Sequence, residues 1–271
     1  MKGLKVLYVS QEITPYLPES EMSVIGRNLP QAIQEKGKEI RTFMPKYGCI
    51  NERRNQLHEV IRLSGMNIII DDTDHPLIIK VASIQAARMQ VYFIDNEDYF
   101  QRKFLFQDDQ GNYFDDNDER TIFFTRGVIE TVKKLQWPPN IIHCHGWFSG
   151  LLALYIKKVY DDDPVFNNAK IIWSVYDNEF GKTLNKTFKE KLIQDGIDGN
   201  DLKILNNPDF LNYCKLIINM SDGIILGSPA IHAGVASYLE KSGKPTLPYQ
   251  DQENYVEAYS VFYETILNGA S

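Results

Sequence analysis

The chain has 271 residues, of which 43% are hydrophobic and 24% are charged, and its formal net charge is −7 at pH 7. A chain of this size and composition can bury a real core, which excludes disordered and fibrous architectures and indicates one sizeable domain or two small ones. The negative net charge repels polyanions at long range, so we expect neither nucleic acid nor a membrane surface as a partner.

The sequence patterns argue against export and membrane insertion. The apolar run at residues 5–10 is followed at once by Gln11 and Glu12, so no signal-peptide core forms, and no run approaches membrane-spanning length. The three cysteines lie far apart, which fits neither a disulfide framework nor a paired-cysteine zinc site. We therefore expect a soluble protein of the cytoplasm.

Short β-branched segments alternate with helical patterns along most of the chain. In chain order we expect strands at 5–9, 39–43, 141–144, 170–175 and 223–226, and helices at 22–33, 117–135, 148–159, 209–219 and 229–240. Between residues 58 and 94 the pattern changes to closely spaced strand candidates, which indicates an antiparallel or hairpin insert. Continuous apolar strands between helices predict a doubly wound α/β domain with a parallel sheet.

The end of the chain divides into a linker and a helix. Residues 241–248, KSGKPTLP, are the one convincing linker by composition. After them, large apolar residues recur with helical spacing at positions 255, 259, 262, 263 and 266, so a final helix must pack against something. We therefore assign the domain to residues 1–240 and the helix to residues 249–271.

The ligand site of a doubly wound sheet lies where the carboxyl ends of its parallel strands open into loops. These loops are 11–22, 145–147, 176–181 and 227–229. His143 and His145 share one face of a strand, a spacing that metal sites use, but no third ligand lies nearby, so we expect no metal. We expect His145 to hydrogen-bond a ligand, above a structural His143. The sequence contains neither GxGxxG nor GxxxxGK[ST], so we expect no cofactor held by a phosphate cradle.

Seven short motifs occur in a specific order between residues 5 and 239. They are SQEITPY (10–16), LPQAI (29–33), FMPKYG (43–48), YFIDN (92–96), DNDERTIFFTRG (116–127), IIHCHGW (141–147) and GSP (227–229). Together they resemble the N-terminal domain of glycogen and starch synthases, which are ADP-glucose-type glycosyltransferases of the GT-B class. The resemblance implies one Rossmann-like half of a two-domain enzyme.

The loop after the first strand departs from the pattern of that family. The family has a lysine and a pair of glycines there, which approach the diphosphate and the sugar of the donor. Pro18, Ser20 and Glu21 occupy those places in this sequence. A fixed ring, a hydroxyl and an anion remove both the attraction and the room for a phosphate.

The motifs at the next two strand ends also differ. Gly146 stands where the family has an aspartate, and Phe148 stands where it has a second histidine. Tyr176 and Asp177 align with the family's His-Asn pair at the transferred sugar, which makes them the catalytic positions by place alone. A tyrosine can still form a hydrogen bond there, but not as an imidazole would.

A bound sugar would need aromatic faces for stacking and polar groups for its hydroxyls. At the strand ends, the side chains with this chemistry are Tyr16, His145, Trp147, Tyr176, Asp177 and Asn178. An alternative interpretation directs Trp147 into the core, as the first large residue of its helix.

The resemblance also implies an expectation about the second, nucleotide-binding half of these enzymes. In the family, the second half binds the nucleotide and supplies the cations that neutralise the leaving diphosphate. We expect this half to be missing here, so the chain should have little activity alone. The segment 254–267 resembles the helix that returns from that half, which implies packing on the first domain. The alternative is an unrelated amphipathic helix.

Three functions follow as hypotheses. The first is a glucan-binding or regulatory relative in α-glucan metabolism, with α-glucan or maltooligosaccharide as its ligand. The second is a glucosyltransferase that uses ADP-glucose together with a partner protein that supplies the donor half. The third is a structural module that self-associates into a homo-oligomer through the open face of its cleft.

Overall fold

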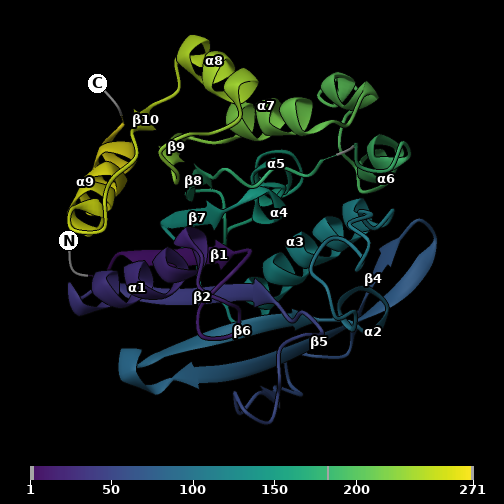
Figure 1. Ribbon diagram of the computed structural model, residues 1–271, viewed down its shortest axis with the longest axis horizontal. Coiled ribbons are helices and arrows are strands. Elements are labelled where there is room, and N and C mark those ends of the chain that lie inside the picture. Colours follow the sequence, from purple (N-terminus) through teal and green to yellow (C-terminus); the bar gives the residue numbers. More distant parts are fainter. Residues whose placement is uncertain (1–2, 182, 270–271) are drawn as a thin grey trace.

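The computed structural model describes residues 3–181 and 183–269, which form a mixed α/β fold around one large sheet (Figure 1). The strands are β1 (Lys5–Ser10), β2 (Glu39–Pro45), β3 (His58–Glu59), β4 (Met66–Ile70), β5 (Thr73–Ile84), β6 (Met89–Asp95), β7 (Ile141–His145), β8 (Lys170–Val175), β9 (Gly223–Leu226) and β10 (Thr246–Leu247). The strand order is β10-β9-β8-β7-β1-β2-β6-β5-β3, and β4 pairs with β5. Neighbours from β10 to β6 are parallel, as the continuous apolar strands predicted.

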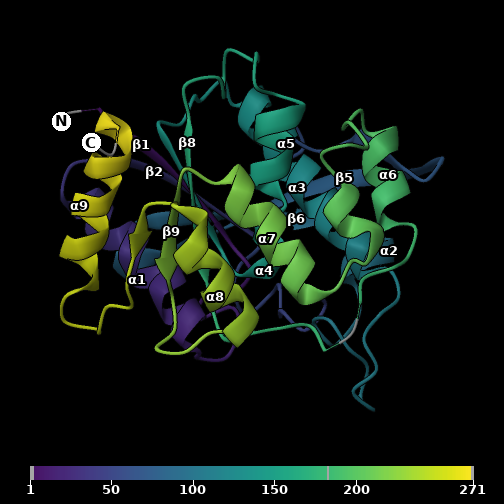
Figure 2. The ribbon, with the colours of Figure 1, turned by 90° about the horizontal axis from the view of Figure 1, so that it is seen from above.

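Helices cover both faces of the sheet. They are α1 (Glu21–Glu35), α2 (Glu97–Phe100), α3 (Asn117–Lys134), α4 (Trp147–Gly150), α5 (Leu152–Lys158), α6 (Phe188–Gln194), α7 (Phe210–Met220), α8 (Ala233–Ser242) and α9 (Tyr255–Asn268). The helices α1 and α9 pack on one face, whereas α3, α5 and α7 pack on the other (Figure 2). The predicted doubly wound α/β class is confirmed.

The insert between residues 58 and 94 is antiparallel, with one difference from the prediction. The strands β3, β4 and β6 all pair antiparallel with β5. On its other side, however, β6 pairs parallel with β2, with Phe43 beside Tyr92. The last strand candidate of the insert is therefore also a strand of the main sheet, because its apolar residues are buried on both faces.

The segment 241–248 is more ordered than a linker. It begins with the last turn of α8, passes through Gly243 in a left-handed conformation (φ 67°), and forms β10 beside β9. From there the chain crosses to the opposite face, where α9 packs beside α1. Tyr259 and Tyr263 of α9 are buried among Val6 and Tyr8 of β1 and other side chains of that face.

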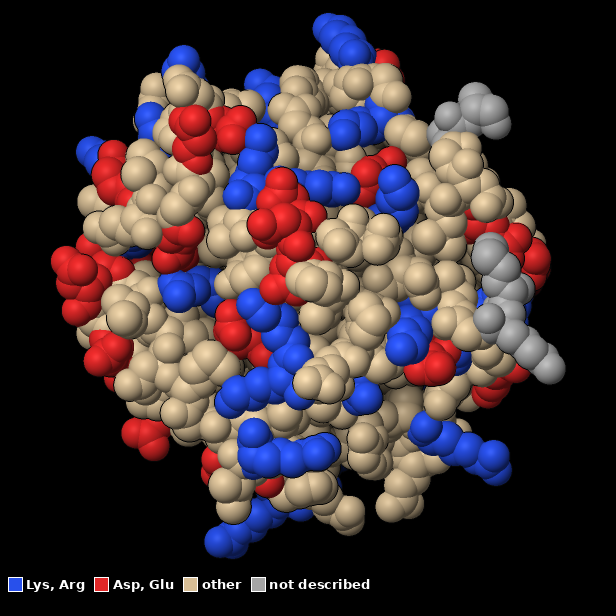
Figure 3. Space-filling view, turned by 180° about the vertical axis from the view of Figure 1, so that it is seen from behind, with Lys and Arg blue, Asp and Glu red and all other residues tan. Residues whose placement is uncertain are grey.

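The surface carries both signs of charge. On the face opposite to that of Figure 1, acidic and basic side chains are distributed over the same area (Figure 3). Toward the lower edge of this view the basic side chains predominate. No helix among the described residues is both long and apolar enough to cross a bilayer.

Candidate functional site

Two adjoining pockets lie at the carboxyl ends of the parallel strands. We call the first, of about 610 Å³, the aromatic pocket; its side chains include Tyr16, Phe104, Phe106, Tyr113 and Trp147. We call the second, of about 470 Å³, the acidic pocket; its side chains include Glu12, Ser20, Glu21, Tyr176, Asp177 and Ser228. Glu12 and Asn178 line both pockets, so the two are neighbours that share part of their wall.

Gln11 connects the loops that separate the two pockets. Its side-chain Oε1 accepts hydrogen bonds from the backbone N–H of Phe148 (3.2 Å) and from Asn178 Nδ2 (3.4 Å). Gly146 passes close by with φ 83°, and a Cβ added there would lie 2.7 Å from Gln11 Oε1 and 2.8 Å from Met22 Cε. Any larger residue at 146 would displace these side chains, which explains why glycine stands there.

The N-terminus of α1 is occupied by side chains of its own loop. Ser20 Oγ accepts a hydrogen bond from the backbone N–H of Ser23 (3.0 Å), and Ser23 Oγ accepts one from the backbone N–H of Ser20 (2.8 Å). Ser20 Oγ also donates to Glu12 Oε2 (2.8 Å). These two reciprocal hydrogen bonds between Ser20 and Ser23 form a capping box. Helix N-termini bind anions through free N–H groups, and the capping box leaves one fewer of these groups free for an anion. Pro18, just before it, has no N–H to offer.

Carboxylates dominate the acidic pocket. Glu21 Oε2 accepts a hydrogen bond from Ser228 Oγ (3.2 Å), which in turn accepts one from the backbone N–H of Asp177 (3.2 Å). Glu21 also raises the pKa of Tyr249, whose hydroxyl donates to it. Glu12 adds a third carboxylate, and among the described residues that line this pocket there is no lysine or arginine.

His145 lies beneath the pockets and not in them. Its side chain is 0% exposed, and its Nδ1 is 2.9 Å from the hydroxyl of Tyr176. Burial lowers the pKa of His145 to about 3 and lowers that of His143 well below its ordinary value, so both imidazoles are neutral at pH 7. His143 contacts Ser174 Oγ (2.7 Å) and the Tyr263 hydroxyl of α9 (2.6 Å). The sequence predicts that His145 faces a ligand, but in the structure α9 packs on the sheet face on which His143 lies, and His145 is buried beside it.

Tyr176 borders the acidic pocket with its ring, but its hydroxyl points to His145. The ring packs over Gly227, where an added Cβ would lie 2.5 Å from Tyr176 Cε1. Asp177, the next residue, is exposed and faces the pocket. Of the two positions that align with the catalytic residues, only Asp177 therefore presents a polar side chain to the pocket.

The aromatic pocket has a rigid inner wall. Trp147 is buried, as the alternative interpretation expected, and its ring lies 4.9 Å from the rings of Phe106 and Phe180. It nevertheless lines the pocket, as does Tyr16, whose ring makes a T-shaped contact with Phe93 at 4.8 Å between ring centroids. Pro18 and Asn178 complete the predicted residues of this pocket.

Sequence reasoning missed the outer wall of the aromatic pocket. Phe104, Phe106 and Tyr113 come from the segment 101–116, which follows β6 and α2, and the sequence analysis did not include the end of β6 among the strand ends of the site. The signal available in the sequence was the density of aromatic residues in an otherwise polar segment. Phe104 is 45% exposed, which is unusual for so large an apolar side chain.

Among the described residues, no three His, Cys, Asp or Glu side chains converge as a metal site requires.

Several known proteins are similar to this chain in sequence. A family model described as the starch synthase catalytic domain matches residues 5–243. The chain is 42% identical to a glycogen synthase of Chlorobium limicola over 65% of this chain and 36% of that protein. It is 35% identical to a glycogen synthase of Chlorobaculum tepidum over 89% of this chain and 51% of that protein. The chain thus spans about half the length, or less, of these relatives.

A solved structure shares the fold. It is the catalytic domain of starch synthase IV from Arabidopsis thaliana, bound to ADP and acarbose, with a TM-score of 0.74 and 20% sequence identity. The match covers 92% of this chain and 52% of that chain, in agreement with one Rossmann-like half of a GT-B glycosyltransferase. The resemblance predicted from the motifs is confirmed, and the chain belongs to the starch synthase catalytic domain family.

Proposed function

We propose that this chain binds α-glucan in the aromatic pocket and does not transfer glucose from ADP-glucose by itself. The observation that carries the proposal is the contrast between the two pockets. One offers aromatic faces beside hydrogen-bonding groups, and the other offers carboxylates where a diphosphate would need positive charge.

The acidic pocket opposes binding of a nucleotide diphosphate in two ways. The fixed carboxylates of Glu12, Glu21 and Asp177 repel a phosphate, and Ser20 already occupies an N–H group at the start of α1. Transfer also requires preorganised cations to stabilise charge on the leaving diphosphate, and this is usually the largest catalytic contribution. The described residues that line the acidic pocket provide none.

The aromatic pocket suits a pyranose ring. Phe104 presents an exposed apolar surface on which a sugar ring can stack, while the half-buried Asn178 offers an amide for hydroxyl groups. A module with this pocket alone would act as a glucan anchor or as a regulatory subunit in α-glucan metabolism.

A second candidate function is a glucosyltransferase whose donor half comes from another chain. The observation that favours it is coverage, because the matches span only 36% and 51% of the two glycogen synthases. This candidate predicts turnover of ADP-glucose only after a partner is added. Failure to recover any second Rossmann-like protein with the native chain would exclude it.

Glucan binding can be tested by affinity electrophoresis in gels that contain glycogen. We expect the wild-type chain to be retarded, and Phe104→Ala to weaken binding about tenfold because it removes the exposed stacking surface. Ile193→Ala is the matched control, since Ile193 is a 42% exposed apolar residue of α6 that lines neither pocket. Unretarded migration of the wild-type chain in glycogen, starch and maltodextrin gels would contradict the proposal.

A further inference from the structure

Arg120 of α3 carries a buried positive charge with one nitrogen of its guanidinium group unused. The side chain is 0% exposed. Its Nε donates to the carbonyl oxygen of Tyr99 (2.8 Å), and its Nη1 donates to the carbonyl oxygen of Leu105 (2.6 Å) and to Asn117 Oδ1 (2.7 Å). Within the described part of the chain, its Nη2 has no hydrogen-bond partner. A buried donor without an acceptor costs free energy, so this nitrogen indicates a missing partner.

The positive charge of Arg120 also has no acidic partner, since none of the described carboxylates forms an ion pair with it. The charge of Asp116 acts on Arg120, but both oxygens of this carboxylate accept hydrogen bonds from Arg102. Burial lowers the pKa of Arg120 to about 10, so the group stays charged at pH 7. The guanidinium carbon lies 5.4–6.0 Å from the ring centroids of four phenylalanines, which are Phe100, Phe106, Phe114 and Phe148. These rings stabilise the cation in part, but a buried charge usually has a counter-ion as well.

A second unused donor lies in the same aromatic cluster. Tyr47, in the loop after β2, is 0% exposed, and its hydroxyl bonds to none of the described residues. Its ring packs against three of the rings that surround Arg120, which are Phe100, Phe106 and Phe148. Burial raises the pKa of Tyr47, and the charge of Arg120 lowers it, as a neighbouring cation does. Two unused donors and one unpaired positive charge are therefore buried together.

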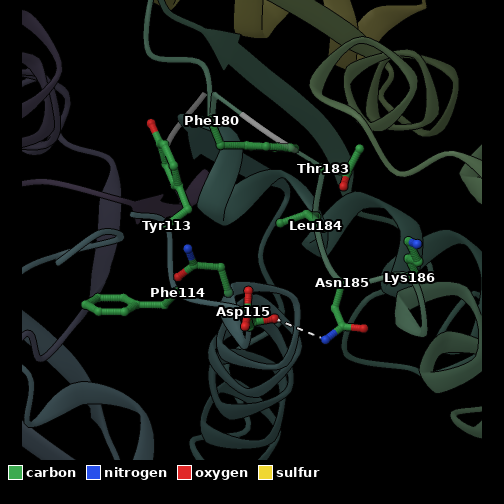
Figure 4. A pocket seen from close by; sticks show the side chains of 9 residues that line it. Tyr113, Phe114, Asp115, Phe180, Thr183, Leu184, Asn185 and Lys186 are labelled. Carbon is green, nitrogen blue, oxygen red and sulfur yellow. Dashed lines mark hydrogen bonds between the residues drawn. The ribbon is translucent and has the colours of Figure 1, made fainter. Parts of the chain in front are cut away.

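This cluster supports the segment 101–116, which forms the outer wall of the aromatic pocket. The bond from Arg120 to the carbonyl oxygen of Leu105 holds the segment from within. Figure 4 shows where the segment reaches the surface, at a pocket of about 400 Å³. There Asn185 Nδ2 donates to the carbonyl oxygen of Asp115 (3.3 Å). A ligand that fixes Arg120 would therefore also help to fix this wall.

We propose that a chloride ion binds in this cluster, between Arg120 Nη2 and the hydroxyl of Tyr47. One positive charge requires one negative charge, and a spherical anion can accept hydrogen bonds from both donors. Larger anions such as phosphate have several acceptor oxygens, each of which would need a donor when buried. A water molecule would accept the same hydrogen bonds but would leave Arg120 without a counter-ion. This inference goes beyond the proposed function, because it involves no sugar.

The first test is urea unfolding of the full chain at constant ionic strength, with sodium chloride replacing sodium gluconate, whose anion is too large for a buried site. An anion that binds only the folded chain stabilises it, so the urea midpoint should rise with chloride and yield a dissociation constant. Tyr47→Phe keeps the ring but removes one donor, and it should weaken chloride binding about tenfold. The matched control is Tyr255→Phe, because Tyr255 is a buried tyrosine in the core on the other face of the sheet. It should keep the wild-type dissociation constant.

The second test locates the anion directly. Crystals of the full chain grown in sodium bromide should show an anomalous-scattering peak within hydrogen-bonding distance of Arg120 Nη2 and the Tyr47 hydroxyl. The proposal is wrong if the wild-type chain and Tyr47→Phe depend equally on chloride, or if bromide gives no peak at this place. Electron density there without an anomalous signal would show that water fills the site instead. Neither test involves a glucan, so failure of the chloride site leaves the proposed function as it stands.

Discussion

Replacing Tyr263 with alanine is expected to lower the free energy of unfolding by about 4 kcal/mol. Tyr263 is a fully buried residue of α9, and its hydroxyl lies 2.6 Å from His143 Nδ1 and 3.4 Å from the Tyr8 hydroxyl. The substitution removes a large ring from the packing between α9 and the sheet. It also leaves buried polar atoms of His143 and Tyr8 without this partner, which adds a desolvation cost.

The measurement is urea unfolding followed by circular dichroism, with two comparison variants. Tyr263→Phe keeps the ring and should cost about 1–3 kcal/mol, because it removes only the hydroxyl. Val261→Ala lies on the same helix, but Val261 is 54% exposed, so its effect should be within about 0.5 kcal/mol. If Tyr263→Ala unfolds at the same urea concentration as Val261→Ala, then α9 does not pack on the sheet in solution.

The second large effect is expected for Lys191→Met. Lys191 of α6 is 4% exposed, and its Nζ donates to Asp118 Oδ2 (2.8 Å) and Glu119 Oε1 (2.6 Å) of α3. Removing the ammonium group leaves Asp118 buried without its cation, which typically costs about 3–5 kcal/mol. We expect this loss near neutral pH, measured by urea unfolding. Lys189→Met is the control, because Lys189 is a less buried lysine of the same helix that bonds to Asn206.

The cost of Lys191→Met should depend on pH. Burial raises the pKa of Asp118 from 3.8 to about 6, although Lys191 lowers it. Between these values the folded state holds more protons than the unfolded state, so this group makes the protein less stable as the pH rises. Without Lys191 the pKa of Asp118 rises further. The variant should therefore lose the most free energy of unfolding, relative to the wild-type chain, at neutral pH, and less at about pH 5. An equal penalty at both pH values would show that Asp118 does not carry the effect.

Most strands could be predicted because each is a short apolar run between polar turns. The segment 170–175 matches β8, and the predicted helix at 117–135 matches α3 to within one residue. The strand β10 could not be predicted, since Thr246 and Leu247 lie between prolines in a stretch typical of a loop. Only the neighbouring edge of β9 makes these two residues a strand.

The acidic pocket could be predicted, because the ligand site of a doubly wound sheet lies at the carboxyl ends of its parallel strands. The direction in which each side chain points could not be predicted in this way. Ser20, Glu21 and Asp177 line this pocket as their loops predicted. His145 does not, because alternation along a strand places His143 and His145 on the same face without saying which face is covered. The helix α9 covers the face on which the histidines lie, and it is more than one hundred residues away from them in the sequence.

We propose that this chain keeps a glucan-binding surface and lacks the contacts that use an activated nucleotide. The most direct measurement is incubation of the purified chain, free of other proteins, with ADP-glucose and maltoheptaose, followed by chromatography of the oligosaccharides. We predict that maltoheptaose binds but is not lengthened. Steady lengthening of maltoheptaose by the chain alone would contradict the claim.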